Sequence, residues 1–368
     1  MLILHKKIIK MKKLELSELH EALGAKMVNF SGYYMPINYM KGIKEEHRIV
    51  REQVGLFDVS HMGEVFVNGR DSLEFLQYVT SNDVSKLLPG RIQYSYLPNE
   101  TGGIVDDFLL YMIAENSYLL VLNASNLKKD LMWLRSKNTF ECKIIDKSSE
   151  FSLLALQGPK SINLLQKLTD INLDSIKYYN FIISNVCDIK DVIISRTGYT
   201  GELGFELYVK NDNVRKLWNY LFSTSEELHP IGLGARNTLR LEKGFCLYGN
   251  DIDENTSPIS AGLSWITSFN KRFINSENLL KEKDEGTRDK LVGIELLEKG
   301  IARKDYKVLD LDGNEVGRVT SGTMSPTLNK SISMAYVRCT SSSLGNKLHI
   351  KVRNKNILCE IVNLPFVK

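Results

Sequence analysis

The sequence contains no long hydrophobic run. None of its apolar stretches approaches the roughly 20 residues that a helix needs to cross a bilayer. With 43% hydrophobic and 25% charged residues, the composition is ordinary for a globular chain of two or three domains. An integral membrane protein is therefore excluded as a class, and we expect no membrane partner.

Cysteine is scarce and scattered. The five cysteines are Cys142, Cys187, Cys246, Cys339 and Cys359. None belongs to a C-x-x-C pair, which argues against a disulfide framework or a zinc ribbon and fits a reducing compartment. Residues 1–13 lack the apolar core and the cleavage site of a secretory signal. We therefore expect a cytoplasmic protein in which residues 1–13 form a disordered extension.

Charge of one sign is not in excess either. The chain has 48 Lys and Arg against 44 Asp and Glu, a net charge of +4, and no basic patch typical of nucleic-acid binding. It also contains no G-x-G-x-x-G fingerprint, no G-x-S-x-G nucleophile elbow and no H-E-x-x-H motif. We therefore expect no nucleic-acid partner, no metal, and no flavin or nicotinamide cofactor.

Helical and strand patterns interleave without a regular β-α alternation, which favours an α+β fold over a doubly wound sheet. Helices are predicted at 45–54 (ended by Gly55), at 71–78 and around 212–221. Strands are predicted at 64–67, 93–97, 105–113, 118–122 and 191–195. Glycines in the segment 99–103 predict a hairpin between two of these strands.

The pattern changes near the C-terminus. The charged stretch 281–290 is typical of a linker, and beyond it the helical periodicity disappears. Short strands separated by turns over 291–368 predict a small antiparallel barrel or sandwich. The region 14–280 is predicted to hold two interleaved α+β subdomains.

The segment Gly102–Asp107 places two adjacent carboxylates at the start of an apolar run. Neighbouring side chains on a strand point to opposite faces, so one of Asp106 and Asp107 is expected to enter a partly desolvated place. Such a carboxylate is typical of a general acid, a general base or a clamp for a cationic nitrogen. The alternative is a turn cap or a partner for an arginine.

A second segment, Arg196–Val209, contains three glycines at three-residue spacing, followed by a strand that carries Glu206 among apolar neighbours. A carboxylate there could accept the paired N–H donors of a flat heterocycle. The alternative is a glycine-rich hairpin with an incidental glutamate at a sheet edge.

A third segment, 232–244, predicts a helix on which Arg236 and Arg240 share one face. Like charges at this spacing repel each other unless an anion is near, and a ligand carboxylate or an internal acid would serve equally well. A fourth segment, Phe57–Glu64, contains His61 between two acids. Without a nucleophile elbow, a buried structural role is favoured for this histidine.

These segments together carry a resemblance. Phe57–Glu64, Gly102–Asp107, Arg196–Glu202 and Leu247–Thr256 occur in the order seen in the aminomethyltransferases of the glycine cleavage system, the T-protein family. The resemblance covers about residues 15–366 and includes Ile301–Lys304 and Thr320–Pro326 in the last domain.

The resemblance implies three small domains around a central folate pocket, the last of them a β-barrel-like unit. It also implies a transfer reaction with tetrahydrofolate as co-substrate. The aminomethyl carbon would move from the lipoyl arm of the H protein to the folate, giving 5,10-methylenetetrahydrofolate, ammonia and the dihydrolipoyl arm. The lipoylated H protein is thus the expected partner, and the free protein is expected to be a monomer.

By position in the family motifs, Asp107 resembles the essential catalytic aspartate, Glu206 the carboxylate that reads the pterin, and Arg236 its matching arginine. The remaining residues expected to line the folate pocket are Tyr94, Tyr199, Met62, Val121 and Asn123. Asn237 stands where the family usually has an aspartate, so an internal ion pair is expected to be missing.

The main alternative is a non-catalytic folate-binding protein of the kind that assists iron–sulfur cluster assembly. Those proteins carry a cysteine motif directly after Lys-Gly. Here Lys243-Gly244 is followed by Phe245, and Cys246 is displaced by one position. We therefore favour the transferase.

Overall fold

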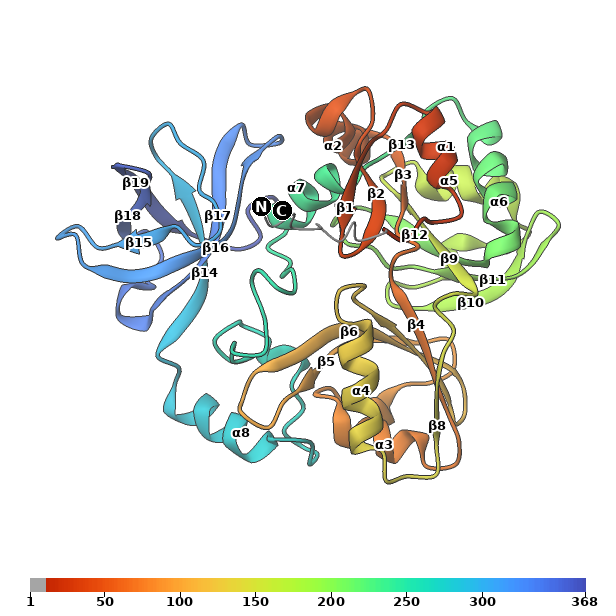
Figure 1. Ribbon diagram of the computed structural model, residues 1–368, viewed down its shortest axis with the longest axis horizontal. Coiled ribbons are helices and arrows are strands. Elements are labelled where there is room, and N and C mark those ends of the chain that lie inside the picture. Colours follow the sequence, from red (N-terminus) through yellow and green to blue (C-terminus); the bar gives the residue numbers. More distant parts are fainter. Residues whose placement is uncertain (1–10) are drawn as a thin grey trace, which may run out of the picture.

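Three lobes make up the structure, a computed structural model that describes residues 11–368 (Figure 1). Two lobes are built on mainly antiparallel sheets, and the third is a closed barrel. Helix α7 (Leu233–Glu242) and the segment 243–275 run between the lobes. None of the helices among the described residues is long and apolar enough to cross a bilayer.

The first lobe is a five-stranded antiparallel sheet with helices on one face (Figure 1). Its strands in sheet order are β5 (Ile92–Pro98), β6 (Ile104–Ala114), β7 (Ser117–Leu122), β4 (Gly63–Asn68) and β8 (Lys143–Asp146). Helices α3 (Ser72–Val79) and α4 (Leu127–Lys137) pack on it. Alternate residues of each strand, such as Val65 and Val67 of β4, enter the core below these helices.

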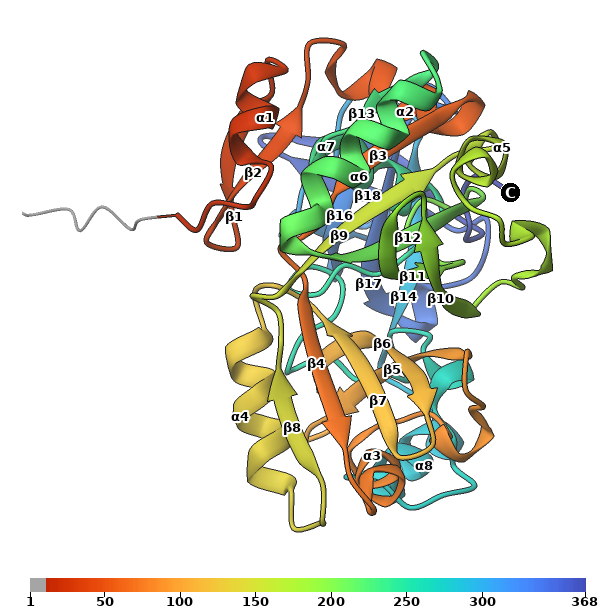
Figure 2. The ribbon, with the colours of Figure 1, turned by 90° about the vertical axis from the view of Figure 1, so that its right-hand side faces the viewer.

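The second lobe is a six-stranded sheet. Its strands in sheet order are β10 (Phe181–Val186), β11 (Ile189–Ser195), β12 (Gly204–Lys210), β9 (Phe151–Gln157), β3 (Val54–Asp58) and β13 (Leu228–Pro230). Helices α5 (Ser161–Leu165) and α6 (Asn211–Thr224) cover its outer face (Figure 2). The helix predicted around 212–221 is confirmed, and the four apolar residues of its stripe are buried on α6.

The inner faces of the two sheets meet in one apolar layer. Phe57 of β3 and Ala155 of β9 belong to the same buried cluster as Tyr111 of β6 and Val121 of β7. The chain passes from β3 into β4 and returns from β8 into β9, so two short connections also join the two sheets.

The N-terminal part adds a hairpin of β1 (Lys26–Phe30) and β2 (Tyr33–Asn38) after helix α1 (Ser17–Ala22). Residues 1–10 of the predicted disordered extension lie outside the described residues. The prediction is wrong at residue 12, because Lys12 accepts from the amide of Tyr34 and donates to the carbonyl of Gly32, each at 2.9 Å. The hairpin offers unpaired backbone groups that a neighbouring segment can satisfy.

The helix predicted at 45–54 is α2 (Gly42–Glu52), which ends earlier than expected. Gly55 is not its cap but the second residue of β3. A Cβ atom at Gly55 would lie 2.4 Å from Cγ1 of Ile231, so this glycine permits a close approach and not a helix end.

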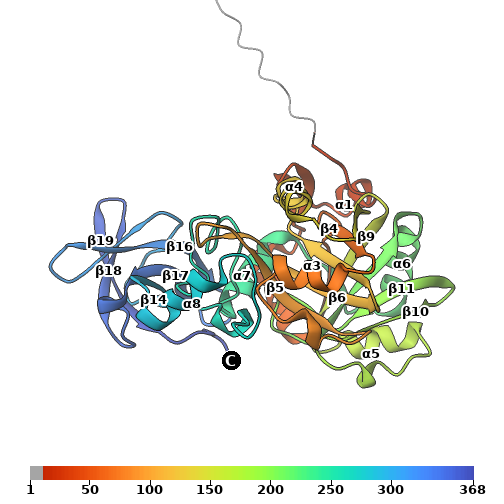
Figure 3. The ribbon, with the colours of Figure 1, turned by 90° about the horizontal axis from the view of Figure 1, so that it is seen from below.

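The third lobe is a closed antiparallel barrel, which confirms the α+β fold with a C-terminal barrel. Its strands in order around the barrel are β14 (Asp289–Leu296), β17 (Lys330–Arg338), β16 (Glu315–Ser325), β15 (Lys307–Leu309), β18 (Lys347–Val352) and β19 (Lys355–Val362). Figure 3 shows the barrel at one end of the molecule, with α7 and α8 (Ser276–Glu285) toward the sheets.

The stretch 281–290 was predicted as a linker, and most of it is regular structure. Residues 281–285 form the second half of α8, and residues 289–290 begin β14, so only 286–288 are irregular. Its alternating acidic and basic residues stabilise the exposed end of a helix, as the pair of Lys281 with Glu285 shows.

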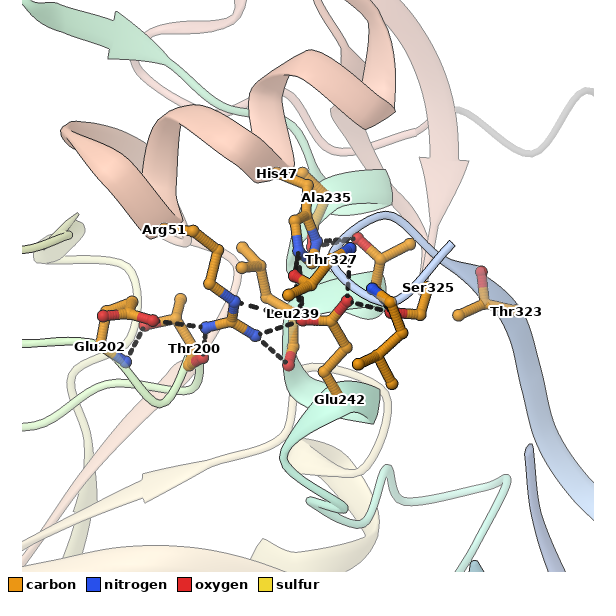
Figure 4. A network of polar contacts seen from close by, with 12 residues as sticks. His47, Arg51, Thr200, Glu202, Ala235, Leu239, Glu242, Thr323, Ser325 and Thr327 are labelled. Carbon is orange, nitrogen blue, oxygen red and sulfur yellow. Dashed lines mark hydrogen bonds and ion pairs between the residues drawn. The ribbon is translucent and has the colours of Figure 1, made fainter. Parts of the chain in front are cut away.

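A network of polar contacts attaches the barrel to α7 and α2 (Figure 4). Its centre is Glu242, which accepts hydrogen bonds from the amide and hydroxyl of Thr327 at 3.1 and 2.8 Å and pairs with Arg51 at 2.9 Å. His47 lies 3.2 Å from the same carboxylate. These contacts join residues from three parts of the chain at one buried side chain.

Candidate active site

The hairpin of β5 and β6 brings Tyr94 beside Asp107, as the predicted hairpin requires. Tyr96 is the register partner of Asp107, so Tyr94 lies on the same face of the sheet. The Tyr94 hydroxyl donates to Oδ2 of Asp107 at 2.7 Å, and Nδ2 of Asn123, just after β7, donates to Oδ1 at 3.0 Å. Each carboxyl oxygen of Asp107 therefore has a donor, and the group is held in one orientation.

The environment of Asp107 shifts its protonation toward neutral pH. Burial raises the pKa of Asp107 to about 7, and the charge of Asp106 acts in the same direction, while the bonds from Tyr94 and Asn123 oppose the shift. A carboxyl group with this pKa can both accept and release a proton under cellular conditions, which suits a general acid or base.

Asp106 points to the opposite face of β6 and is fully buried. It accepts hydrogen bonds from the backbone N–H of Asn123 at 3.1 Å, from its Nδ2 at 2.9 Å and from Nδ2 of Asn126 at 2.6 Å. The structure thus gives the two neighbouring carboxylates separate roles. Asp106 orders the backbone and side chains around it, and Asp107 faces the candidate site.

Glu206 lies on β12, an interior strand paired with both β11 and β9. The alternative of an incidental glutamate at a sheet edge is therefore excluded. The side chain is buried and its Oε2 accepts from the Thr197 hydroxyl at 2.5 Å, behind which lies Ser195 at 2.7 Å. Burial raises the pKa of Glu206, and Thr197 and Arg236 oppose the rise. Within the described chain no residue donates to Oε1 of Glu206, so this oxygen is free for a ligand.

The two arginines of α7 have different surroundings. Arg240 is paired with Asp251 at 2.7 Å, with both side chains buried, and its Nε donates to Asn237 at 2.9 Å. Asn237, where an ion pair is expected to be missing, accepts this hydrogen bond as a neutral amide. Arg236 has no such acid: its buried Nη1 has no partner among the described residues.

Arg236 instead lies over the ring of Tyr199, with Cζ 4.8 Å from the ring centre. The ring of Tyr199 stacks on Phe245 at 5.7 Å, and its hydroxyl donates to the carbonyl of Cys246. A buried guanidinium with an unused N–H is costly unless a ligand or water completes its hydrogen bonds. The Arg236 guanidinium therefore still needs a hydrogen-bond acceptor, which a ligand or a water would supply.

The polar groups on the two sheets face one region. Burial raises the pKa of Tyr199, and the charge of Asp107 adds to the rise. Burial also raises the pKa of Tyr94, with further contributions from Asp107 and Tyr199. Met62 and Val121, which are predicted to line the pocket, make no polar contact with Asp107 or Glu206. They belong to the apolar layer between the sheets, Val121 as a core member and Met62 as a half-buried residue packed against it.

His61 fits the structural role favoured from the sequence. It is buried, with the ring of Phe30 at 5.5 Å and the ring of Tyr33 at 6.3 Å. Burial and the charge of Arg236 lower its pKa to about 3, so the imidazole is neutral. A neutral ring beside Arg236 adds no second positive charge there.

Several residues around the site were not predicted from the sequence. Asn126, which precedes α4, and Asp130 of α4 are buried near Asp106, and the Thr197 hydroxyl supports Glu206. Asp130 had one signal: it lies on the apolar stripe of its helix, beside Leu131 and Leu134, where an acid is unusual.

Outside this region, the described barrel has a groove of about 610 Å³ on its surface. Barrel residues alone line this groove, among them Lys299, Arg303, Arg353 and Lys355. None of the residues predicted for the folate site belongs to it.

Comparisons with known proteins identify the family of the chain. Residues 16–271 match the family model of the GCVT N-terminal domain, and residues 290–368 match that of the glycine cleavage T-protein C-terminal barrel domain. An aminomethyltransferase of Flavobacterium psychrophilum is 51% identical over 360 residues, covering 97% of this chain and all of the relative. One from Bacteroides fragilis is 52% identical over 362 residues, with the same shares covered.

A solved structure has the same fold. The crystal structure of glycine cleavage system aminomethyltransferase T from Bartonella henselae superimposes with a TM-score of 0.92 at 36% identity, covering 97% of this chain and 98% of that one. The family models together span most of the sequence, and the similarity to curated relatives extends over nearly its full length. The chain therefore belongs to the aminomethyltransferase family of glycine cleavage T proteins.

Proposed function

We propose that this aminomethyltransferase moves the aminomethyl carbon from the lipoyl arm of the H protein to tetrahydrofolate. The products would be 5,10-methylenetetrahydrofolate, ammonia and the dihydrolipoyl H protein. The observation that carries the proposal is the carboxyl group of Asp107, held by Tyr94 and Asn123 with a pKa of about 7. Transfer to a folate nitrogen requires proton movement at that nitrogen, and a group with this pKa is suited to it.

In this proposal Asp107 is the catalytic residue. It hydrogen-bonds the reacting region of the folate and relays a proton as the carbon changes partners. When ionised, it also stabilises the cationic, iminium-like species that forms as ammonia leaves. Tyr94 and Asn123 keep the carboxyl group in position by occupying one lone pair on each oxygen.

Glu206 and Arg236 are proposed to hold the pterin. Oε1 of Glu206 has no donor within the described chain and can accept an N–H of a flat heterocycle. The unused Nη1 of Arg236 can donate to an oxygen of the same ring system. Tyr199, Met62 and Val121 would supply aromatic and apolar walls.

The proposal extends to the protein's setting. Tetrahydrofolate is the only co-substrate it needs besides the lipoyl arm, and no metal, flavin or nicotinamide enters the reaction. We propose that the free protein is a cytoplasmic monomer that meets the H protein transiently.

A single-turnover assay tests the proposed reaction. H protein that carries the aminomethyl-lipoyl arm is mixed with excess enzyme, with and without tetrahydrofolate, and methylenetetrahydrofolate and ammonia are followed together. Formation of both products at one rate, dependent on folate, supports the transferase. Folate binding without either product would instead indicate a non-catalytic folate protein.

A further inference from the structure

Asp130, on α4, is buried beside the candidate active site and accepts no hydrogen bond from residues 11–368. Its side chain is 0% exposed, and neither carboxyl oxygen has a donor among the residues that the structure describes. An ionised carboxylate in such a place would be an uncompensated buried charge, which is strongly destabilising. A carboxyl group without donors is therefore neutral, and a neutral carboxyl group has one proton to donate.

Asp106 on β6 is an acceptor within reach of this proton. Neither oxygen of Asp130 has a donor in the described chain, but the pKa of each carboxyl group responds to the other as a hydrogen-bond partner, which requires that one of the two is protonated. Asp106 also receives three N–H bonds, two from Asn123 and one from Asn126, whereas Asp130 receives none. Burial raises the pKa of Asp106, but Asp130 and these three donors oppose the rise, so Asp106 is the ionised member of the pair and Asp130 the protonated one. Burial raises the pKa of Asp130 to about 11, and the charge of Asp106 adds to the rise.

The other ionisable groups near the pair do not neutralise Asp130. Lys129, its neighbour on α4, lowers the pKa of Asp130 only in part. The Lys129 ammonium lies 2.7 Å from the Tyr248 hydroxyl and 3.6 Å from Glu254, so it is directed to other partners. The remaining neighbour, Asp107, adds a third carboxyl group and no positive charge.

Asn123 connects this pair to Asp107. Its Nδ2 lies 2.9 Å from Oδ1 of Asp106, 3.0 Å from Oδ1 of Asp107 and 2.9 Å from the Asp107 carbonyl. Three acceptors around one amide nitrogen fix which end of the amide faces the carboxyl groups. If Asp106 shifted, Asn123 would lose its anchor, and Asp107 would lose one of its two donors.

We propose that Asp130 is a positioning residue: it keeps a proton at neutral pH and donates it to Asp106, which holds the Asn123 amide against Asp107. The proton stays within the pair during turnover, so Asp130 supplies a hydrogen-bond donor and not a titrating acid. The link to catalysis rests on the proposed function of Asp107. The protonation of Asp130 does not, because it is a property of the protein without substrate.

Infrared difference spectroscopy tests the protonation directly. The full-length Asp107→Asn variant removes the nearby group that titrates near neutral pH, and it is compared with the double variant that adds Asp130→Asn. We expect a C=O stretch of a protonated carboxyl group in the first protein at neutral pH and its loss in the second. If Asp130→Asn removes no such band, the proposal is overturned, whether or not the enzyme is active.

Glu64→Gln is the matched control for the spectra. Glu64 is also buried, and its two carboxyl oxygens also have no partner among the described residues. It lies on β4, and Asp106 is not among the groups that shift its pKa. In the Asp107→Asn background, Glu64→Gln should leave the Asp130 band in place. A control that removed the same band would show that the band had been assigned to the wrong residue.

Kinetics of two single variants test the positioning role. Asp130→Asn keeps a donor and should retain kcat within about threefold, with an unchanged pH profile, whereas Asp130→Leu should lower kcat at least tenfold with a smaller change in KM for tetrahydrofolate. Thermal unfolding of both variants separates this effect from a loss of folded protein. Equal impairment of both variants, or full activity of Asp130→Leu, contradicts the proposal, and if Asp130→Leu does not fold, the infrared comparison decides alone.

Discussion

At the scale of single residues, Asp106 and Asp107 show how one strand places two identical side chains in different environments. Adjacent positions face opposite sides of β6, so Asp106 is buried among amides while Asp107 faces Tyr94. The sequence predicted that one of them would be desolvated. It could not show that both are, because the donors to Asp106 come from Asn123 and Asn126, which only the fold places there.

The pH dependence of turnover should report the protonation of Asp107. Burial raises its pKa from 3.8 to about 7, so its ionised fraction increases as pH rises through 7. If the ionised form stabilises the cationic species, the single-turnover rate should rise with an apparent pKa of about 7 and level off above it. A rate that stays constant between pH 5.5 and 8.5, with intact protein throughout, would contradict this role.

Asp107 should also reduce the stability of the fold. A carboxyl pKa that is higher in the folded state than in the unfolded state makes ionisation unfavourable to folding, so the loss of stability grows as pH rises from 3.8 toward 7. Asp107→Asn removes this effect. The Tm of the variant, measured by calorimetry, should therefore exceed that of the wild type by more at pH 8 than at pH 5. An equal difference in Tm at the two pH values would show that folding does not raise the pKa of Asp107.

Glu206 allows a test of the pterin assignment. Glu206→Gln leaves a group of similar size on β12 but removes the charge, and folate binding should weaken by about tenfold or more, as expected for a lost hydrogen bond to a charged group. Calorimetric titration with tetrahydrofolate measures the effect. Glu295→Gln is the control, since Glu295 lies on a barrel strand and pairs with Lys330. Unchanged affinity in Glu206→Gln would remove this residue from the site.

At the scale of elements, periodic sequence patterns predicted those helices and hairpins that depend only on nearby residues. The stripe of α6 and the hairpin of β5 and β6 were predictable because their spacing alone specifies them. The end of α2 was not, because Gly55 is required by the approach of Ile231, which is distant in sequence. The two arginines of α7 were likewise equivalent in sequence, and only the contact of Arg240 with Asp251 separates them.

The contact between α7 and the barrel should depend on Glu242. Burial opposes its ionisation, but hydrogen bonds from His47, Ser325 and Arg51 lower its pKa from 4.5 to about 2. A depressed pKa contributes stability above pH 4.5 that is lost as pH falls toward 2. Glu242→Gln should therefore lower the free energy of unfolding by about 3 kcal/mol at pH 7.

Urea unfolding at several pH values measures this difference. The curves of wild type and Glu242→Gln should converge as pH falls from 4.5 toward 2, because the wild-type carboxylate is then protonated. The exposed pair of Lys307 with Glu315, removed by Glu315→Gln, is the matched control and should change stability little. A difference in stability that is independent of pH would show that the charge of Glu242 does not contribute to the free energy of unfolding.

At the scale of the whole molecule, the candidate site depends on all three parts. Asp107 comes from the five-stranded sheet and Glu206 from the six-stranded sheet, while Arg236 comes from α7, which the Glu242 network ties to the barrel. The sequence predicted these residues through motifs that match a family. It did not indicate that Asp130 supports them, because that role depends on how α4 packs against β6.

A site assembled from separate lobes should stabilise the whole chain when a ligand fills it. Tetrahydrofolate at a hundred times its Kd should add about 2.7 kcal/mol to the free energy of unfolding of a cooperatively unfolding protein. Differential scanning calorimetry should show one transition that moves to higher temperature with ligand. A shift confined to one of several transitions would place the ligand within a single lobe.

The central claim is that Asp107 carries out proton transfer and is not merely a binding residue. Its most direct test is the single-turnover reaction of Asp107→Asn with aminomethyl-loaded H protein and saturating tetrahydrofolate, alongside the folate Kd of the same variant. We predict a rate lower by a factor of at least about a hundred with the Kd changed by no more than a few-fold. A variant that keeps its rate once folate is saturating would contradict the account.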